Sequence, residues 1–320
     1  MKKIFIFFLT MGTISAFADE SANIIRNAEQ VLEATKVVCS GISDEIGKVA
    51  NISKANTAVT VVGTVAAGGA LATGIAKSQE EQDIEKLIDE LCAMGGCDAN
   101  TIRTMSTSQK YDIIQKLSEI SDLQEEINKK ADKSKKLGNW RTGLMAGTIG
   151  TNLASAIMSG LNTNQSDLIQ HISACNNMVK TLSNIELDLK AAGIGPMHSP
   201  VVKKLSNAKT WCNQINIQDI EKIEKRMKGV MGTSIAGTAI GAIGVGTSAA
   251  ANSDKYMDAA NKVKLSEEDK KKEHALNTTA NVMAGANTVA GSVETGLNIS
   301  LITLTKKLMD QANRCEEILK

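Results

Sequence analysis

The chain contains only two prolines in 320 residues, Pro196 and Pro200, and they lie close together. Proline interrupts helices because it lacks an amide proton and clashes with the preceding turn. Long helices are therefore allowed almost everywhere else, including one continuous helix over about residues 22–91. We predict an all-α protein with its main turn at residues 193–199, where Gly193 precedes Pro196 and a second helix begins at Pro200.

Residues 1–18 have the pattern of a cleaved signal peptide. Lys2 and Lys3 precede a short apolar run, and Ala16 and Ala18 are small residues at the positions that a signal peptidase reads. We expect cleavage after Ala18 and export to the periplasm, the cell surface or the medium. An uncleaved membrane anchor is the alternative.

The composition argues against several classes of ligand. Without the two lysines of the signal peptide, 36 − 2 = 34 basic residues face 35 acidic ones, a balance that is unusual for a nucleic-acid-binding protein. All four phenylalanines lie in the first 17 residues, so few aromatic side chains remain to stack on bases or sugars or to line a ligand pocket. We predict no nucleic-acid partner and no small-molecule substrate.

Four stretches rich in Gly, Ala, Thr and Ser contain no charged residue. They cover residues 55–76, 142–166, 229–253 and 275–293. Between them, apolar residues recur at helical spacing, which predicts coiled-coil-like helices. The three clearest stripes are Ile84, Leu87, Ile88 and Leu91; Ile113, Leu117, Ile120 and Ile127; and Leu168, Ile172, Cys175, Val179, Leu182 and Leu189. Valine and threonine at residues 57–65 also allow a β-strand, but the flanking helical pattern disfavours it.

The order of these features repeats along the chain. Cys39 lies 24 residues before Gly63, and Cys212 lies 25 residues before Gly237. A Met-Ala-Gly triplet also precedes the next cysteine in both halves, at residues 145–147 and again at 283–285. This order indicates a tandem duplication with halves near 39–178 and 212–318. Chance matching between segments of similar composition is the alternative.

The duplication leads to a prediction of two long antiparallel helical hairpins. The first covers residues 19–192 and the second residues 200–320, joined by the turn at 193–199. Long hairpins of this kind form a rod-like bundle. Small residues allow helix backbones to approach each other, so we expect close helix contacts at five glycines: Gly63, Gly147, Gly237, Gly241 and Gly285.

Cysteines in an exported chain predict disulfides. If the hairpins pack with their small-residue segments facing each other, Cys39 reaches the level of Cys175, and Cys212 reaches the level of Cys315. We favour this pairing. Because Cys175 and Cys212 also mirror each other about the central turn, Cys175 with Cys212 and Cys39 with Cys315 is a rival that spacing alone does not separate.

A third, local disulfide is expected between Cys92 and Cys97, which enclose Ala-Met-Gly-Gly at a helix end. The spacing excludes a redox CxxC motif, and a zinc site lacks two further ligands nearby. Free buried thiols are the alternative for all six cysteines.

The sequence contains no recognisable catalytic or cofactor motif. His171 lies one helical turn before Cys175 but has no third metal ligand nearby, so we interpret it as structural. His198 and His274 have no nucleophile at a suitable spacing. The stretch at residues 41–49 resembles a phosphate loop, yet it has five residues between its glycines and ends in valine where Ser or Thr is needed. We predict a non-enzyme without a metal or cofactor.

Two functions from different classes remain. We favour an exported, disulfide-clamped structural or interaction protein that contacts another protein or itself. The alternative is a membrane-inserting protein, either a pore former or an envelope channel, whose four uncharged segments are each about long enough to cross a bilayer. Trp140 and Tyr256 at segment ends resemble interface anchors. The asparagines of the fourth segment, Asn277, Asn281 and Asn287, and a charge distribution that breaks the positive-inside rule argue against insertion.

Overall fold

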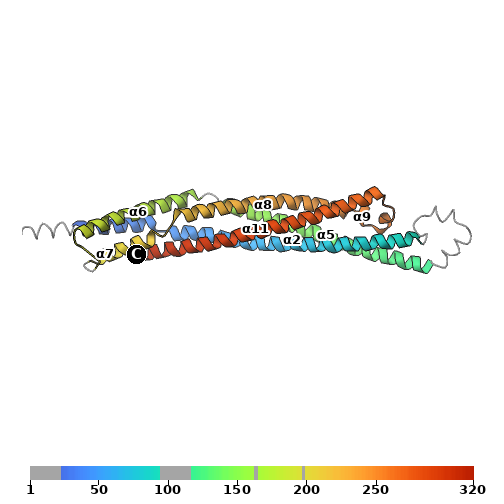
Figure 1. Ribbon diagram of the computed structural model, residues 1–320, viewed down its shortest axis with the longest axis horizontal. Coiled ribbons are helices and arrows are strands. Elements are labelled where there is room, and N and C mark those ends of the chain that lie inside the picture. Colours follow the sequence, from blue (N-terminus) through green and yellow to red (C-terminus); the bar gives the residue numbers. More distant parts are fainter. Residues whose placement is uncertain (1–22, 94–116, 162–164, 197–198) are drawn as a thin grey trace, which may run out of the picture. The chain divides into compact units, whose positions relative to one another are not determined.

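The computed structural model describes residues 23–93, 117–161, 165–196 and 199–320, and these residues form helices and turns without a strand (Figure 1). The all-α prediction is therefore confirmed, and the β interpretation of residues 57–65 is wrong because they lie inside α2. The helices are α2 (Ile42–Ala93), α5 (Leu117–Leu161), α6 (Ser166–Ala191), α7 (Pro200–Cys212), α8 (Ile217–Ala251), α9 (Asp254–Met257), α10 (Ala259–Lys262) and α11 (Glu267–Leu319).

Glycine and proline mark several of the helix boundaries. Residues 23–39 form a helix before α2, and Gly41 separates the two with a φ of 83°, so the expected single helix over residues 22–91 is interrupted. A positive φ is readily adopted by glycine alone. Gly193, with a φ of 73°, follows the end of α6, and α7 begins with Ser199 at the N-cap and Pro200 in its first turn, as expected.

The chain divides into two compact units. Unit 1 contains residues up to Ala55, residues 158–229 and residues 297–320, and unit 2 contains residues 56–157 and 230–296. Each unit takes segments from both predicted hairpins, and α2, α5, α8 and α11 contribute residues to both units. The tandem duplication and the signal peptide stay predictions.

Unit 1 has an apolar core. The predicted stripe from Leu168 to Leu189 is buried along α6, which packs against α7. Two disulfides join its helices: Cys39 to Cys175, with 4.9 Å between the Cα atoms, and Cys212 to Cys315, with 4.7 Å. This is the pairing favoured from the sequence, and the rival pairing is not formed.

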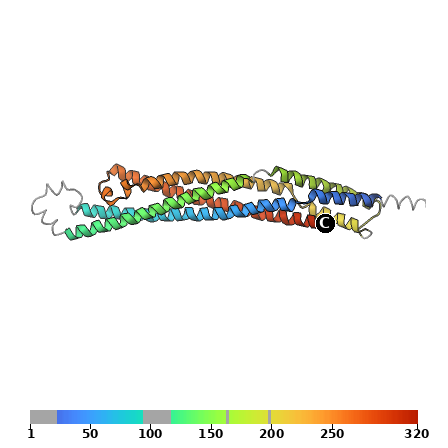
Figure 2. The same ribbon diagram turned by 180° about the vertical axis from the view of Figure 1, so that it is seen from behind.

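Unit 2 consists mainly of four helices that lie side by side in both views (Figures 1 and 2). Contacts of their side chains define the directions. Lys77 of α2 bonds to Asn277 of α11, while Thr64 of α2 lies against Gly291, so α2 and α11 run antiparallel. Ser155 of α5 bonds to Ser234 of α8, and Arg141 bonds to Ser248, so α5 and α8 also run antiparallel.

Candidate functional site

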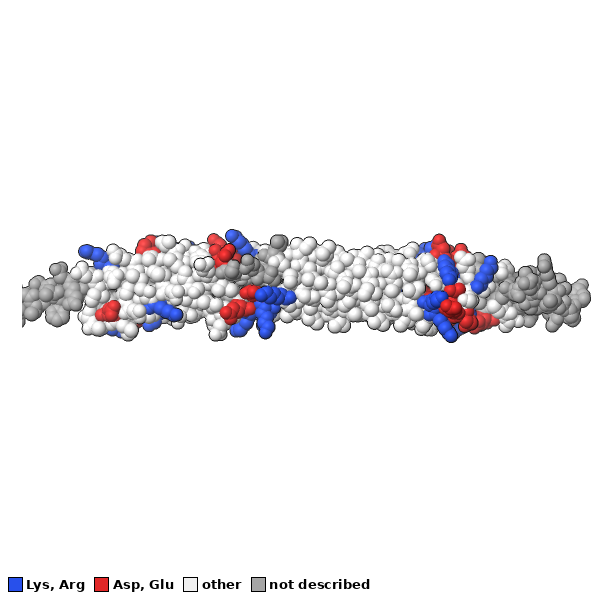
Figure 3. Space-filling view, turned by 90° about the horizontal axis from the view of Figure 1, so that it is seen from above, with Lys and Arg blue, Asp and Glu red and all other residues white. Residues whose placement is uncertain are grey.

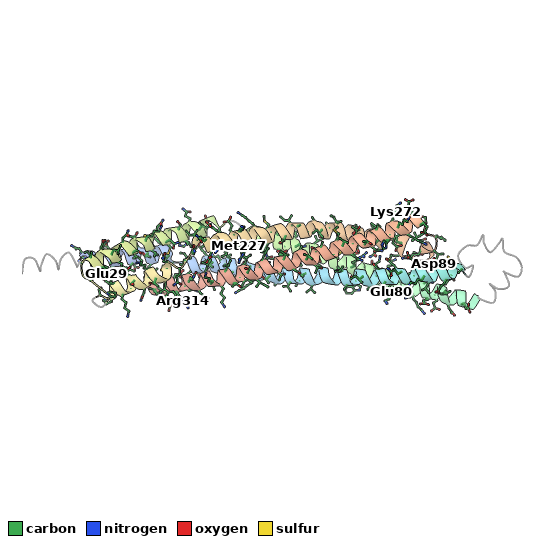
Figure 4. The ribbon with its side chains drawn as sticks, in the orientation of Figure 1. Glu29, Glu80, Asp89, Met227, Lys272 and Arg314 are labelled. Carbon is green, nitrogen blue, oxygen red and sulfur yellow. A yellow bond between two sulfur atoms is a disulfide. The ribbon has the colours of Figure 1, made fainter. Side chains whose placement is uncertain are left out.

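One part of unit 2 is built like an ordinary soluble helical bundle. We call it the charged part, and it comprises residues 77–93, 117–141 and 254–274. Its interior is apolar, with Ile84, Ile88, Leu91, Ile127 and Ala131 in one buried cluster, which confirms the first predicted stripe. Its surface carries ion pairs between α2 and α5, in which Lys130 and Lys133 of α5 contact Glu80 of α2. Glu80 is labelled in Figure 4.

The remaining part of unit 2 has the opposite arrangement. We call it the uncharged part, and it comprises residues 56–76, 142–157, 230–253 and 275–293. Its large apolar side chains point outward, and Figure 3 shows a wide surface without Lys, Arg, Asp or Glu. The exposed apolar residues come from all four helices: Val61, Val62, Val65, Ile75, Leu153, Ile157, Ile235, Ile243, Val282, Val289 and Val293.

The interior of the uncharged part is polar. Its buried side chains include hydroxyls and amides from all four helices, together with small residues. The buried polar residues are Asn56, Thr60, Thr148, Asn152, Ser155, Ser234, Ser248, Asn277 and Asn287, and the carboxylate of Glu294 follows at one border. A soluble protein normally places such groups outside and valine and isoleucine inside.

Two buried cations mark the border with the charged part. Lys77 and Arg141 are both fully buried. The ammonium of Lys77 contacts Glu81 at 2.7 Å and donates to Asn277 Oδ1 at 2.8 Å. The guanidinium of Arg141 donates to Ser248, Asn281 and Asn277 at 2.8–3.2 Å, so each of its three nitrogens makes a hydrogen bond. Burial lowers the pKa of Lys77, and the neighbouring Glu81 partly opposes this effect.

A second buried pair lies beside these cations. Lys262 and Glu273 are nearly inaccessible to solvent and are 2.8 Å apart. Burial raises the pKa of Glu273, and the charge of Lys262 acts in the opposite direction. A small cavity of about 50 Å³ adjoins both groups and is also lined by Glu81, His274 and Asn277. The cavity therefore brings titratable groups next to the buried cations.

An apolar layer follows within the core. Ala70, Met145 and Ala284 form a buried cluster, surrounded by partly buried Leu71, Leu144, Val245 and Met283. Gly244 of α8 lies so close to this layer that a Cβ there would be 3.1 Å from Met283 and 3.2 Å from the sulfur of Met145. Met145 lies one helical turn beyond Arg141 on α5, so this layer separates the buried cations from the rest of the polar core.

Beyond the apolar layer, two asparagines face each other. Asn152 of α5 donates from Nδ2 to Oδ1 of Asn287 of α11 at 3.1 Å. A Cβ at Gly237 would be 2.5 Å from Asn152 Nδ2 and 3.0 Å from Asn287 Oδ1, so glycine allows α8 to lie against this pair. Asn287 Nδ2 is buried without a hydrogen-bond partner among the described atoms.

A buried carboxylate follows further along the core. Glu294 is 1% exposed, and its Oε1 accepts hydrogen bonds from the hydroxyls of Ser155 and Ser234. Both hydroxyls come from helices other than α11, Ser155 from α5 and Ser234 from α8. The core thus contains, in order, a cation cluster, an apolar layer, an asparagine pair and a buried carboxylate.

Comparisons with protein-family models, with curated proteins and with solved structures found no match to the chain. The case for a function therefore depends on the geometry above.

The structure corrects two of the five glycine predictions. Gly63 and Gly241 lie at close contacts like that of Gly237: a Cβ at Gly63 would be 3.1 Å from Thr151 Cβ, and one at Gly241 would be 2.8 Å from Ile149. Gly147 and Gly285 instead have open space, with no heavy atom within 4 Å of an added Cβ. Gly63 therefore packs against Thr151, one helical turn from Gly147 on α5.

His171 and the cysteines of unit 1 make contacts within that unit. His171 contacts the Val38 carbonyl at 2.9 Å and Glu45 at 3.3 Å. The sulfurs of Cys39, Cys175 and Cys315 lie within 4.8 Å of one another, but all three belong to disulfides. The predicted disulfide between Cys92 and Cys97 falls partly outside the described residues, because the described part of this helix ends at Ala93. His198 and Ile113 are also outside them.

Unit 1 has an open groove of about 430 Å³ on its surface. Arg314 lies over the ring of Trp211, 4.7 Å from its centre, and occupies one side of the groove. Lys306, Lys307 and Asp310 line the same groove, so with Arg314 it carries three cations and one anion.

Sequence reasoning missed Lys77, Arg141 and Glu294 because each flanks an uncharged segment and was counted as its boundary. A signal was present. Lys77 continues the alternating three- and four-residue spacing of Ile84, Ile88 and Leu91 towards the N-terminus. Extending the stripe into the uncharged segment would have placed this lysine inside the bundle.

Proposed function

We propose that the protein is an exported, non-enzymatic protein whose unit 2 inserts into a lipid bilayer through its uncharged part. The observation that carries this proposal is the reversal within unit 2. Around Ile84, Ile88 and Leu91 the charged part has an apolar core under an ion-paired surface, whereas the uncharged part has a largely polar core, interrupted by the Met145 layer, under an apolar surface. Water favours the first arrangement, whereas hydrocarbon favours the second.

The dimensions support a bilayer as the solvent of the uncharged part. Residues 56–76 of α2 span ~30 Å at ~1.5 Å per residue, which equals the hydrocarbon thickness of a typical bilayer. The helices over Asn23–Ala93 and Pro200–Ala251 are long and apolar enough to cross a membrane, and only 28% of the apolar window of each is buried. Trp140, 69% exposed beside Arg141, suits an interface anchor, but Tyr256 is buried and does not.

The structure also answers one objection raised by the sequence. Asn277 and Asn287 are buried, and Asn281 bonds to Arg141. Their amides therefore face partners inside the bundle, where hydrogen bonds between helices hold membrane proteins together. The lipid-facing positions of α11 include Val282, Val289 and Val293.

Unit 1 supports the exported location. Two disulfides are stable in oxidising compartments and rare in the cytosol.

A structural or interaction protein without membrane insertion is the second candidate. It is favoured by outward-facing glycines on α5, since added Cβ atoms at Gly143, Gly147 and Gly150 would meet nothing within 4 Å. Such a flat surface suits close contact with a helix of a second copy. In that case the apolar surface would be covered by protein.

Vesicle flotation of two lysine variants tests the proposal. Val282 is 58% exposed near the middle of the uncharged part, and Leu187 is 63% exposed on α6 of unit 1. A lysine at the bilayer centre costs about 2.5–3.5 kcal/mol, so Val282→Lys is expected to shift protein away from the vesicle fraction. Leu187→Lys is the matched control and should float like the wild type.

A different set of results would contradict insertion of unit 2 into the bilayer. If the wild type is monodisperse without detergent, fails to float with vesicles and is released from envelopes by carbonate, insertion is wrong. Loss of a detergent-free oligomer in Val282→Lys would then favour the second candidate.

A further inference from the structure

We propose that the polar core of unit 2 conducts protons across the bilayer and that the Met145 layer restricts the flux along this path. The inference rests on the proposed insertion of unit 2. It concerns what the inserted bundle does, not whether it inserts.

Polar groups line the core on both sides of the Met145 layer. From Asn277 to Glu294, α11 advances ~25 Å, most of the hydrocarbon thickness. Over that length, hydroxyls, amides and ionisable groups face inward. Ionisable residues inside membrane segments are expensive to bury, and they commonly belong to ion paths or proton relays.

The tight packing of the core favours protons over larger ions. Gly237, Gly241 and Gly244 bring α8 into close contact with side chains of α5 and α11, so the core is tightly packed. A hydrated ion needs an open pore. A proton needs only a chain of single water molecules and groups that accept and release it, which is compatible with a narrow core. The unpaired Nδ2 of Asn287 would be stabilised by such a water molecule.

Titratable groups lie at both ends of the polar core of unit 2. Glu294 lies at one end, hydrogen-bonded by Ser155 and Ser234. At the other end, the 50 Å³ cavity is lined from α2 by Glu81 and Glu85, from α10 by Lys262, and from α11 by three titratable residues, Lys270, Glu273 and His274. Lys77 and Arg141, both fully buried, lie at the same end, where they are hydrogen-bonded to Asn277.

Proton transfer through Glu294 conserves atoms and charge. A hydronium ion on one side of Glu294 transfers its proton to a carboxylate oxygen, which forms an O–H bond and leaves water. That O–H bond breaks when the proton passes to a water molecule on the other side, and the carboxylate is restored. Nothing is oxidised or reduced.

The apolar layer explains how flux along such a path is restricted. Met145, Ala70 and Ala284 offer no hydrogen bond, and an apolar constriction excludes a water chain by dewetting. Met145 is the large side chain among the three. Replacing it with serine would supply a hydroxyl and free space at the same point.

The test uses the full chain in vesicles that contain a pH-sensitive dye, with a potassium gradient and valinomycin to drive proton entry. Glu294→Gln keeps the size of the side chain but removes its titration, and we expect proton flux to fall by about a hundredfold, the low end for a positioned proton carrier. Met145→Ser is expected to raise the flux by about tenfold, because the dewetted layer is lost. Glu126→Gln, an exposed change on α5, should match the wild type.

Each outcome bears on a separate claim. Flotation of the same vesicles measures insertion, so a protein that does not float contradicts both the proposed function and this inference. A protein that floats but conducts no protons in either the wild type or Met145→Ser contradicts the path alone. Unchanged flux in Glu294→Gln, or release of entrapped calcein by the wild type, also overturns a proton path. If Glu294→Gln does not fold, the comparison of Met145→Ser with the wild type decides.

Discussion

Buried carboxylates in the two units have opposite electrostatic environments. In unit 1, Glu186 contacts Lys209 at 2.8 Å and Lys190 at 3.0 Å, and the hydrogen bond from Lys209 lowers its pKa most. Asp219 has the same arrangement with Lys222 and Lys307, and its pKa is also lowered. In unit 2, the pKa of Glu273 is raised because burial outweighs its single lysine partner. The balance between burial and lysine contacts decides the direction: desolvation is the largest effect on Glu273, whereas a hydrogen bond from lysine is the largest effect on Glu186 and Asp219.

The Glu186 cluster predicts acid sensitivity of unit 1. A carboxylate with a lowered pKa in the folded state stabilises the protein above its unfolded pKa of about 4.3, and this contribution is lost as the pH falls through the folded pKa. Glu186→Gln should therefore be less stable at pH 7, by on the order of 1.5 kcal/mol for a charged hydrogen bond. Near pH 2 it should match the wild type.

Urea unfolding at a series of pH values, followed by circular dichroism, measures this effect. A constant difference between Glu186→Gln and the wild type from pH 7 to pH 2 would show that the charge of Glu186 does not contribute. Leu187→Lys provides a neighbouring exposed substitution for comparison.

At the scale of single helices, α8 shows what glycine contributes. A glycine inside a helix costs about 1 kcal/mol relative to alanine, and α8 contains several. Those at positions 237, 241 and 244 recover that cost because they allow side chains of α5 and α11 to approach the α8 backbone. Gly232 and Gly246 have open space instead. One helix therefore has glycines of two kinds.

The two kinds of glycine should respond differently to the same substitution. Gly237→Leu would collide with Asn152 and Asn287, and overpacking typically costs about 1–3 kcal/mol or more. Gly147→Leu on α5 meets open space and gains helix propensity, so its free energy of unfolding should be unchanged or slightly raised. Thermal unfolding in matched detergent compares the two. Equal destabilisation would show that Gly147 also lies at a contact.

At the scale of the whole molecule, covalent links are concentrated in unit 1. The disulfides close loops with sequence separations of 136 and 103 residues. They connect the helix over residues 23–39 to α6, and α7 to α11. In unit 2, the described residues outside the 92–97 region are held by packing and hydrogen bonds. The two units therefore differ in how they respond to reductant.

Removing the disulfides is expected to destabilise unit 1 selectively. For loops of this length the chain-entropy contribution is about 2–5 kcal/mol for each bond. The double variant Cys39→Ser with Cys175→Ser should lower the unfolding temperature and expose unit 1 to proteases. Protection of unit 2 by vesicles should persist. Non-reducing peptide mapping of the wild type checks the pairing, and a peptide that links Cys39 to Cys315 would support the rival connectivity.

The sequence alone determined the helical class, the positions of the uncharged segments and the set of possible disulfides. These follow from properties local to the chain: the near absence of proline, the three- and four-residue spacing of Ile84, Ile88 and Leu91, and the equal levels of Cys39 and Cys175. The signal peptide, the duplication and the rod-like shape are predictions at this level.

Only the tertiary structure decided which face of each uncharged segment lies inside. In residues 55–76 and 142–166, glycine, alanine and threonine occur on every face, so no stripe of large apolar residues identifies a core. Packing settles the matter through contacts between residues far apart in sequence: Asn152 meets Asn287, and Arg141 meets Asn277. Burying hydrogen-bonded polar groups together avoids the cost of leaving them unpaired, and it turns valine and isoleucine outward.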